Sequence, residues 1–236
     1  MNVLLFDDRD ITQASSRITL RDHRAVHAHT ILKVQTGDSL RVGKIEGLMG
    51  TAIVVSSAAD ELTVDLGELT ENSPAPSRVE LILALPRPKS LKRTLRAIAN
   101  LGIKRVHLIN SVRVDKSYWT APALQPEVLR ATLLEGLSIA RDTRMPEVKL
   151  HKLFKPFAQD VAPHLNSGQA FVAHPSARKS QDLPANGNVQ IAIGPEGGFT
   201  DYEVGLLGEA GFESLSLGER VYSVENAVPV LTALFR

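Results

Sequence analysis

A glycine-rich segment offers backbone groups, rather than charged side chains, for binding a ligand. It reads Ile-Gly-Pro-Glu-Gly-Gly-Phe-Thr over residues 193–200. The apolar run 189–193 predicts a buried strand, and Thr200 with Glu203 forms the sequence pattern of a helix capping box. Glycines between a strand and a helix let a ligand approach the main chain closely and leave N–H groups directed at it. A second marker, Leu-Gly-Glu-Arg-Val-Tyr-Ser-Val-Glu-Asn-Ala, follows at residues 217–227.

A predicted helix over residues 89–101 carries four cations on one face. They are spaced at i, i+3, i+4 and i+7, namely Lys89, Lys92, Arg93 and Arg96. A solvated surface would account for such a face, and so would contact with nucleic-acid phosphates. Arg87 precedes the helix, and no acidic residue occurs between it and residue 110. This one-sided charge favours phosphate contact.

Several other chemistries find no support in the residue pattern. The chain has no cysteine, which excludes disulfides, thiolate metal sites and a cysteine nucleophile. His27 and His29 lie two residues apart with no carboxylate at metal-ligand spacing, so no metal site is expected. The glycine fingerprints of ATP and dinucleotide sites do not occur. His174, just past a predicted strand, is either an edge residue or a ligand contact, since open sheets bind ligands at strand ends.

Two regions with different sequence patterns must position these residues. Residues 1–70 contain short apolar runs separated by turn signals, with a short helix over 21–31, and this pattern indicates a small β-barrel. Residues 71–77 are polar and contain two prolines, as expected of a linker. Residues 78–236 alternate apolar runs with helical stretches, which predicts an α/β domain with a mainly parallel sheet. Strands are expected there at 79–85, 105–109, 170–173, 189–193 and 214–217, and helices at 89–101, 126–142, 202–210 and 226–235.

The composition sets the broad class of protein. A length of 236 residues with 43% apolar side chains provides enough material for one large core or two small ones. Because the net charge is only +1, binding to RNA would depend on a local basic patch. No apolar run approaches the roughly 20 residues of a membrane span, and the first residues do not resemble a signal peptide. These features predict a cytoplasmic protein that does not bind a membrane.

The two markers together are far more specific than the glycines alone, which would fit an ordinary tight connection. The chain resembles the SPOUT superfamily of knotted methyltransferases and, within it, the small-subunit (16S) rRNA uridine-N3 methyltransferase family of the RsmE type. The resemblance covers nearly the whole length. The family motifs and their positions here are Gly-Pro-Glu-Gly-Gly-Phe at 194–199 with a Glu at 203, Leu-Gly-x-Arg-Ile-Leu-Arg-x-Glu-Thr-Ala at 217–227, His…Val-Leu-Arg…Gly-Asp at 27, 31–33 and 37–38, Leu-Pro with Lys at 85–86 and 89, and Leu-Gly-Ile at 101–103.

This resemblance implies an α/β fold with a C-terminal SPOUT trefoil knot and an N-terminal PUA-like β-barrel that recognises RNA. It also implies that S-adenosyl-L-methionine (SAM) binds among three loops of the knot and that two subunits form a homodimer. One of these loops would follow Ala173. The SAM contacts carried over to this chain are Ala173, His174, Ile193, Gly194, Pro195, Glu196, Gly197, Gly198, Leu217, Gly218, Val221 and Asn226.

The implied reaction is methylation of uridine N3 in 16S rRNA, as naked RNA or within the small ribosomal subunit. The uridine nitrogen must be deprotonated and aimed at the methyl group, so positioning is the main catalytic contribution. Arg220 is the expected catalytic residue, because a cation would stabilise the developing uridine anion. RNA contacts are expected from Lys33, Arg87, Lys89, Lys92, Arg93 and Arg96.

Departures from the family pattern leave other interpretations open. Ser223 stands where the family has a second Arg, and a hydroxyl cannot replace a guanidinium. Ser138 and Ile139 replace a Glu-Gln pair, and an alkyl group cannot make the hydrogen bonds of an amide. The other departures are Asn226 for Thr, Asn100 for Glu and Val3 for Arg. The chain could thus be an active methyltransferase, a SAM- and RNA-binding relative with weak or no activity, or an RNA-binding module without SAM.

Overall fold

The chain folds into two compact units, each described here by itself. A computed structural model describes residues 2–12, 16–165, 168–174, 183 and 186–235. The first unit comprises Met1–Ala75 with Leu137–Met145, and the second comprises Pro76–Gly136 with Pro146–Arg236. Residues 137–145, which the sequence groups with the C-terminal domain, therefore pack with the N-terminal unit.

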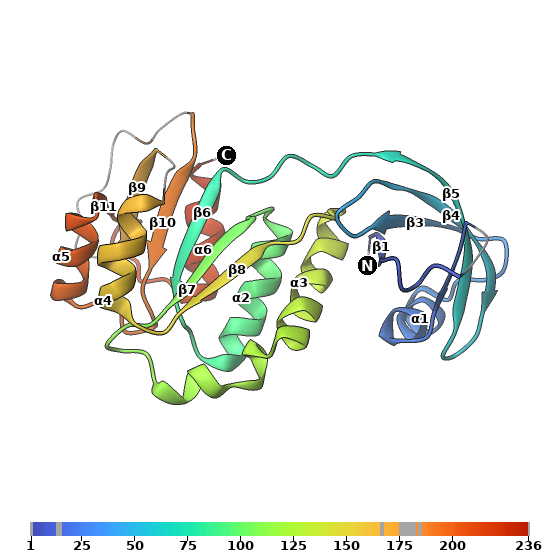
Figure 1. The fold of residues 1–236 in the computed structure, drawn as a ribbon, viewed down its shortest axis with the longest axis horizontal. Helices are drawn as coiled ribbons and strands as arrows, with labels where there is room; N and C mark the ends of the chain where they lie inside the picture. The colour runs from blue at the N-terminus through green and yellow to red at the C-terminus, as the bar shows by residue number, and fades with distance from the viewer. Residues whose placement is uncertain (1, 13–15, 166–167, 175–182, 184–185, 236) are drawn as a thin grey trace. The chain divides into compact units, whose positions relative to one another are not determined.

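The first unit is built on a five-stranded, barrel-like sheet (Figure 1). Its strands are β1 Leu4–Phe6, β2 Arg17–Leu20, β3 Ser39–Lys44, β4 Met49–Ser57 and β5 Leu62–Glu71, in the order β1-β3-β4-β5-β2. Only β1 and β3 are parallel. Alternate residues of β4 are buried, and Phe6, Ile18 and Val64 contribute to the core beneath the sheet. The sequence did not predict β2, because four alternating residues give only a weak strand signal.

The helix predicted over 21–31 forms as α1 His23–His27 followed by one π-helical turn, η1 Ala28–Leu32. Asp22 caps its start, since the carboxylate accepts a hydrogen bond from the main-chain N–H of Arg24 at 2.9 Å. The Arg24 guanidinium in turn pairs with Asp10 and Asp22. The helix ends at Lys33, whose φ of 53° reverses the chain.

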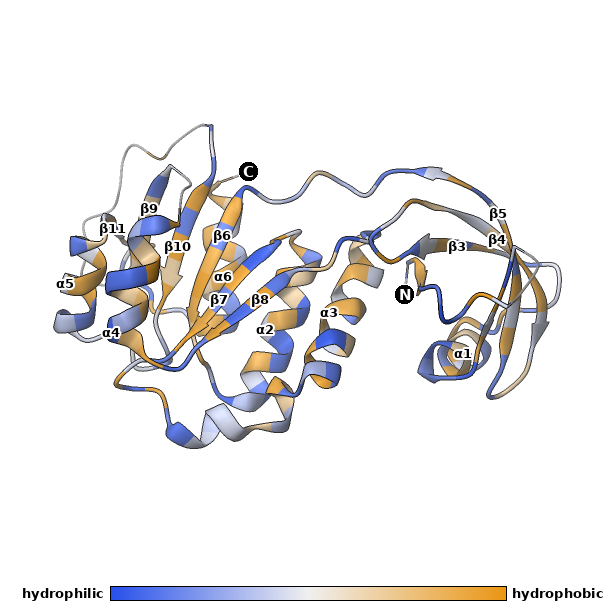
Figure 2. Cartoon of the chain, in the orientation of Figure 1, coloured by the Kyte–Doolittle hydropathy of each residue, from blue (hydrophilic) through white to orange (hydrophobic). Residues whose placement is uncertain are grey.

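The second unit is built on six strands, all parallel. They are β6 Val79–Ala84, β7 Arg105–Ile109, β8 Glu147–His151, β9 Gln169–Ala173, β10 Val189–Ile193 and β11 Phe212–Leu215, in the order β11-β9-β10-β6-β7-β8. Every residue of β6 and β10 is buried, and Figure 2 shows both strands as largely apolar. The expected parallel α/β sheet is confirmed. The sequence missed β8, an edge strand whose charged, partly exposed residues give no apolar run.

Helices cover this sheet on both faces. The longer ones are α2 Pro88–Asn100, α3 Pro126–Ala140, α5 Asp201–Glu209 and α6 Val224–Ala233. The short ones are η2 Lys116–Thr120, η3 Pro122–Leu124, α4 Phe154–Pro156, η4 Phe157–Val161 and η5 Ala162–His164. Helix α2 packs against α6, which contacts β10, whereas α5 packs against β11 and η4. The threading of the C-terminal segment into a knot stays a prediction.

The direction of the strands decides where a site can form. The chain adds β7 and β8 on one side of β6, then crosses to the other side for β9 and β11. In open parallel sheets, ligands bind at the carboxyl ends of strands where the strand order reverses. Among the described residues, no helix combines the length and apolarity of a membrane span, and no group of acidic and His side chains could hold a metal ion.

Candidate functional site

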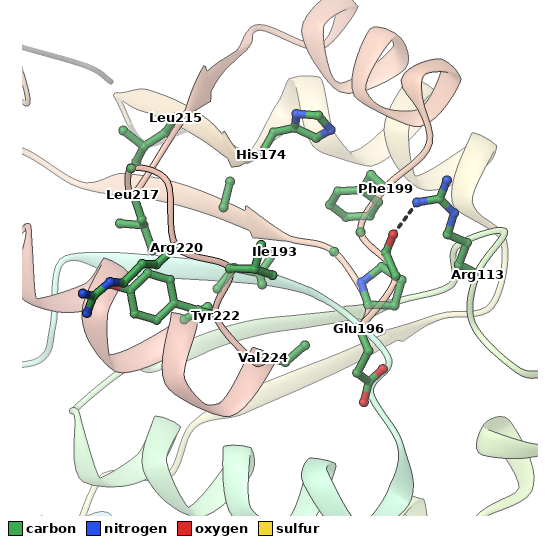
Figure 3. Close-up of a pocket in the computed structure, with 18 residues that line it drawn as sticks. Arg113, His174, Ile193, Glu196, Phe199, Leu215, Leu217, Arg220, Tyr222 and Val224 are labelled. Carbon is green, nitrogen blue, oxygen red and sulfur yellow. Dashed lines mark hydrogen bonds between the residues drawn. The ribbon is translucent and has the colours of Figure 1, made fainter. Parts of the chain in front are cut away.

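A pocket of about 330 Å3 lies at the carboxyl ends of β9, β10 and β11 (Figure 3). This volume lies within the range of small-molecule sites. The lining comes from four separate parts of the second unit, which the parallel sheet brings to one edge. These residues are Arg113, Ala173, His174, Ile193, Gly194, Pro195, Glu196, Gly197, Gly198, Phe199, Leu215, Leu217, Gly218, Arg220, Val221, Tyr222, Val224 and Ala227.

The glycine-rich loop after β10 is a tight turn that favours glycine at two positions. A Cβ atom on Gly194 would lie 2.7 Å from the main-chain nitrogen of Phe199, closer than any side chain tolerates. The N–H of Gly198 donates to the carbonyl of Pro195 at 2.7 Å, and Gly198 has a φ of 71°. At Gly197, in contrast, a Cβ atom would meet only the flexible side chain of Arg113. The loop thus presents main chain to the pocket.

Buried Glu203 anchors this loop to a neighbouring one. The predicted capping box is confirmed, because the Glu203 carboxylate accepts from the N–H of Thr200 at 2.8 Å while Thr200 accepts from the N–H of Glu203. The other carboxylate oxygen accepts from the N–H of Val112 at 2.8 Å. Glu203 is only 1% exposed. One side chain therefore connects the start of α5 with the loop that follows β7.

Arg113, which the sequence did not predict as a site residue, lies on that second loop. One terminal nitrogen of its guanidinium, Nη1, donates to the carbonyl oxygen of Gly197, and Figure 3 shows this contact at one end of the pocket. Arg113 comes four residues after the end of β7. Parallel strands end at a common edge of the sheet, so this place in the sequence could have suggested a site residue.

The segment after β11 forms the opposite end of the pocket. Ser216 holds its turn by accepting a hydrogen bond from the N–H of Gly218 at 3.1 Å, and Gly218 has a φ of 99°. Beyond it, Arg220 and Tyr222 lie together in Figure 3, far from Arg113. Arg220 is exposed and forms no ion pair with any acidic side chain that the structure describes. Its charge is therefore available to a bound molecule.

The structure brings together every predicted SAM contact except Asn226. Asn226 lies exposed on the first turn of α6 and does not line the pocket. Ser223 is the N-cap residue of this helix, without a side-chain capping bond. The third predicted wall, the loop after Ala173, is described only as far as His174, and the rest of it lies mostly outside the described residues. The lining residues that the sequence did not assign are Arg113, Phe199, Leu215, Tyr222, Val224 and Ala227.

The predicted basic face of α2 is divided by its neighbours. Arg93 Nε pairs with Glu225 of α6 at 2.8 Å, and Arg96 pairs with Glu135 of α3. Lys89 and Lys92 are exposed and have no ion-pair partner among the described residues. The sequence could not reveal these pairs, because both acidic residues come from other helices. Two of the four cations on the predicted face therefore have acidic partners, and the contact of this face with RNA stays a prediction.

Two other predicted RNA contacts lie at separate places. Arg87 precedes α2, and its main-chain N–H donates to the Glu196 carboxylate at 3.2 Å, so the start of α2 adjoins the glycine-rich loop. Lys33 lies in the first unit, exposed at the end of η1.

Two of the departures from the family pattern contact each other within the first unit. The hydroxyl of Ser138 donates to the carbonyl of Val3 at 2.6 Å, and the N–H of Val3 donates to the carbonyl of Ser138 at 3.1 Å. Val3 is buried, whereas Ile139 is exposed. Asn100 is exposed at the end of α2. The two positions are thus in contact through the main chain of Val3.

Comparison with known proteins assigns the chain to a family. A family model described as an RNA methyltransferase domain matches residues 73–236. The chain belongs to this family. The RsmE-type resemblance of the sequence is confirmed by relatives of this RNA methyltransferase that are named ribosomal RNA small subunit methyltransferase E. The one from Treponema pallidum is 27% identical over 96% of this chain and 87% of its own length, and the one from Synechocystis is 26% identical over 92% and 71%.

Solved structures share the fold of this RNA methyltransferase over nearly its whole length. A Legionella pneumophila protein with bound SAM matches with a TM-score of 0.80 at 19% identity, covering 99% of this chain and 96% of its own. The ribosomal RNA small subunit methyltransferase E of Neisseria gonorrhoeae, bound to SAM, matches with a TM-score of 0.75 at 18% identity, covering 98% and 96%. The mixed α/β fold with its barrel-like N-terminal part is therefore confirmed.

Proposed function

We propose that this protein transfers a methyl group from SAM to the N3 atom of a uridine in 16S rRNA. The observation that carries the proposal is the pocket itself, in which both sequence markers meet at the carboxyl edge of a parallel sheet. Membership of the RNA methyltransferase family and the names of the relatives support the substrate class.

The pocket fits SAM in both shape and chemistry. Gly194 has no room for a side chain, and the φ of 71° at Gly198 disfavours one, so a ligand can lie directly against main-chain groups. Leu215, Leu217 and Val221 supply apolar surface suited to an adenine ring. When bound, SAM supplies a methyl group on a positively charged sulfur. Ala173, His174, Ile193–Gly198, Leu217, Gly218 and Val221 would hold it.

Arg220 is the proposed catalytic residue. It lines the pocket, it is exposed toward an incoming substrate, and an Arg side chain stays charged at all physiological pH values. A uridine whose N3 proton has left carries negative charge on its ring, and a guanidinium beside the ring stabilises that charge. A single positioned donor of this kind contributes on the order of 2–4 kcal/mol to catalysis.

The RNA would be held by cations of both units. Arg87 directly precedes α2, and Lys89 and Lys92 lie in its first turns, beside the Glu196 loop. Phosphate contacts there would bring the target base close to the pocket. Arg93 and Arg96 contribute less, because each already has an acidic partner. The barrel-like domain, residues 1–70, would add Lys33 and be joined by the linker 71–77 to the SPOUT knot domain, residues 78–236.

The active form is proposed to be a cytoplasmic homodimer. Within its own unit, α6 buries Val228 and Leu231, but Leu234 at its end is 42% exposed and Val221 before it is 80% exposed. These exposed apolar groups suit a contact with a second copy.

Transfer of labelled methyl from SAM to small ribosomal subunits tests the proposal. The subunits come from cells that lack the modification, and naked 16S rRNA serves as the parallel substrate. We expect label in one uridine and a stop of primer extension at that nucleotide, because methylation at N3 blocks base pairing. Binding of SAM without any transfer would support the weak or inactive relative instead. Absence of SAM binding would remove the methyltransferase proposal.

A further inference from the structure

Arg113 carries a positive charge at one end of the pocket that nothing in the described structure neutralises. A guanidinium has five N–H donors, and the described contacts use one of them, on the carbonyl of Gly197. Arg113 forms no ion pair with an acidic side chain in the described part of the chain. A neutral carbonyl does not balance a full charge, so donors remain for an anionic group in the pocket.

The position of Arg113 is fixed from both sides. The preceding residue, Val112, donates its main-chain N–H to the buried carboxylate of Glu203. On the other side, the Arg113 side chain lies against Gly197, where an added Cβ atom would be 3.1 Å from its Cδ atom. Because side chain and main chain are both held, little entropy is lost when the guanidinium binds an anion.

Each end of the pocket has one arginine, but the end with Arg220 also has an apolar lining, so the two ends differ in chemistry. Figure 3 shows Leu215 and Leu217 at one end and Arg113 at the other. Glu196 is no competitor for Arg113, since its carboxylate accepts from the N–H of Arg87 and is drawn pointing away from Arg113. A molecule with an apolar ring system at one end and a carboxylate at the other matches this arrangement.

We propose that Arg113 binds the carboxylate at the amino-acid end of SAM and thereby sets the direction in which SAM lies. The proposal rests on the proposed function, since it takes SAM as the ligand of the pocket. Arg113 also positions the glycine-rich loop through Gly197, so the test must separate charge recognition from support of the loop.

Calorimetric titration with SAM and with decarboxylated SAM makes this separation, because the two molecules differ only in the carboxylate. A charge-assisted hydrogen bond contributes enough to predict that the wild type binds SAM roughly 10- to 150-fold more tightly than the decarboxylated form. In Arg113→Gln, which retains a donor for Gly197, this preference should fall to nearly one. Arg113→Lys should keep part of it. Lys116→Gln removes an exposed cation from the same stretch of chain and should keep the full preference.

Each other outcome overturns the proposal. If Arg113→Gln weakens both ligands by the same factor, Arg113 only supports the loop. If the wild type binds both ligands equally, or if Arg113→Gln keeps the wild-type preference, the carboxylate lies elsewhere, while the proposed function stands. If the wild type binds neither ligand, the proposed function itself fails.

Discussion

Replacing Glu203 by Ala should loosen the site without removing any residue that lines it. Glu203 is 1% exposed, and its carboxylate accepts from the N–H groups of Thr200 and Val112, both at 2.8 Å. The change therefore breaks the cap of α5 and releases the Val112 loop in one step.

The size of the effect follows from these two contacts. Loss of a helix cap costs about 0.5–2 kcal/mol, and loss of a hydrogen bond to a charged group costs about 1.5–3 kcal/mol. Together they lower the free energy of unfolding by about 2–5 kcal/mol, against the ~5–15 kcal/mol typical of a folded protein. In a chain of this length we expect the melting temperature to fall by roughly 4–20 °C. If the displaced conformation of the released loop is about ten times more populated than the native one, the apparent affinity for SAM falls about tenfold.

Thermal unfolding and calorimetric titration with SAM, at a temperature where all variants are folded, measure the two effects. Glu203→Gln keeps one carbonyl oxygen as an acceptor and should fall between wild type and Glu203→Ala in both. Glu209→Ala, at the exposed end of the same helix, is the matched control and should behave as wild type. A Glu203→Ala protein that melts earlier but binds SAM as tightly as wild type would refute the link between this anchor and the pocket. An unchanged melting temperature would refute the energetic argument.

Three further predictions concern the pocket, the RNA contacts and the departures. Gly197→Val should lower SAM affinity at least tenfold while the protein stays folded, because the new side chain displaces Arg113 from the loop; calorimetry that finds wild-type affinity would contradict this. Reversing Lys89 and Lys92 to Glu should reduce the slope of log RNA affinity against log salt concentration by about 1.4–1.8, the contribution of two phosphate contacts, without changing SAM affinity. An identical slope in variant and wild type would mean that this face is merely solvated. Ser223→Arg should raise methyl transfer in single-turnover assays and leave SAM affinity unchanged, if a cation there acts mainly in the transition state; an unchanged rate would mean that Arg220 suffices.

Local chemistry explains which features could be predicted from the sequence. The turn at Gly194–Gly198 and the capping box at Thr200 and Glu203 depend on neighbours within ten residues, and both form as expected. The second carboxylate oxygen of Glu203 accepts from the N–H of Val112, ninety-one residues away, and no pattern in the sequence predicts that contact. The role of Arg113 at the pocket follows from the same long-range packing.

A buried polar network gives a second example of this limit. Residues 79–85 read as a continuous apolar run, yet Glu80 within it is 5% exposed. Its carboxylate contacts the ring of His107 at 3.2 Å, and His107 contacts His151 at 3.0 Å. Burial works against the charged form of Glu80, but the hydrogen bond with His107 and the charge of Arg105 outweigh it and hold the pKa of Glu80 below its ordinary value. Partners on the neighbouring strand β7 make an acidic residue acceptable in the sheet.

The departures from the family pattern differ in what they can affect. Ser138 bonds through its hydroxyl to the main-chain carbonyl of Val3, so this departure has a structural contact within the first unit. Asn226 lies outside the lining of the pocket. Ser223 alone lies between two lining residues, Tyr222 and Val224, and its side chain makes no capping bond that an Arg would sacrifice. If this chain is slower than an active relative, position 223 is therefore the departure to test first, because it adjoins residues that line the pocket.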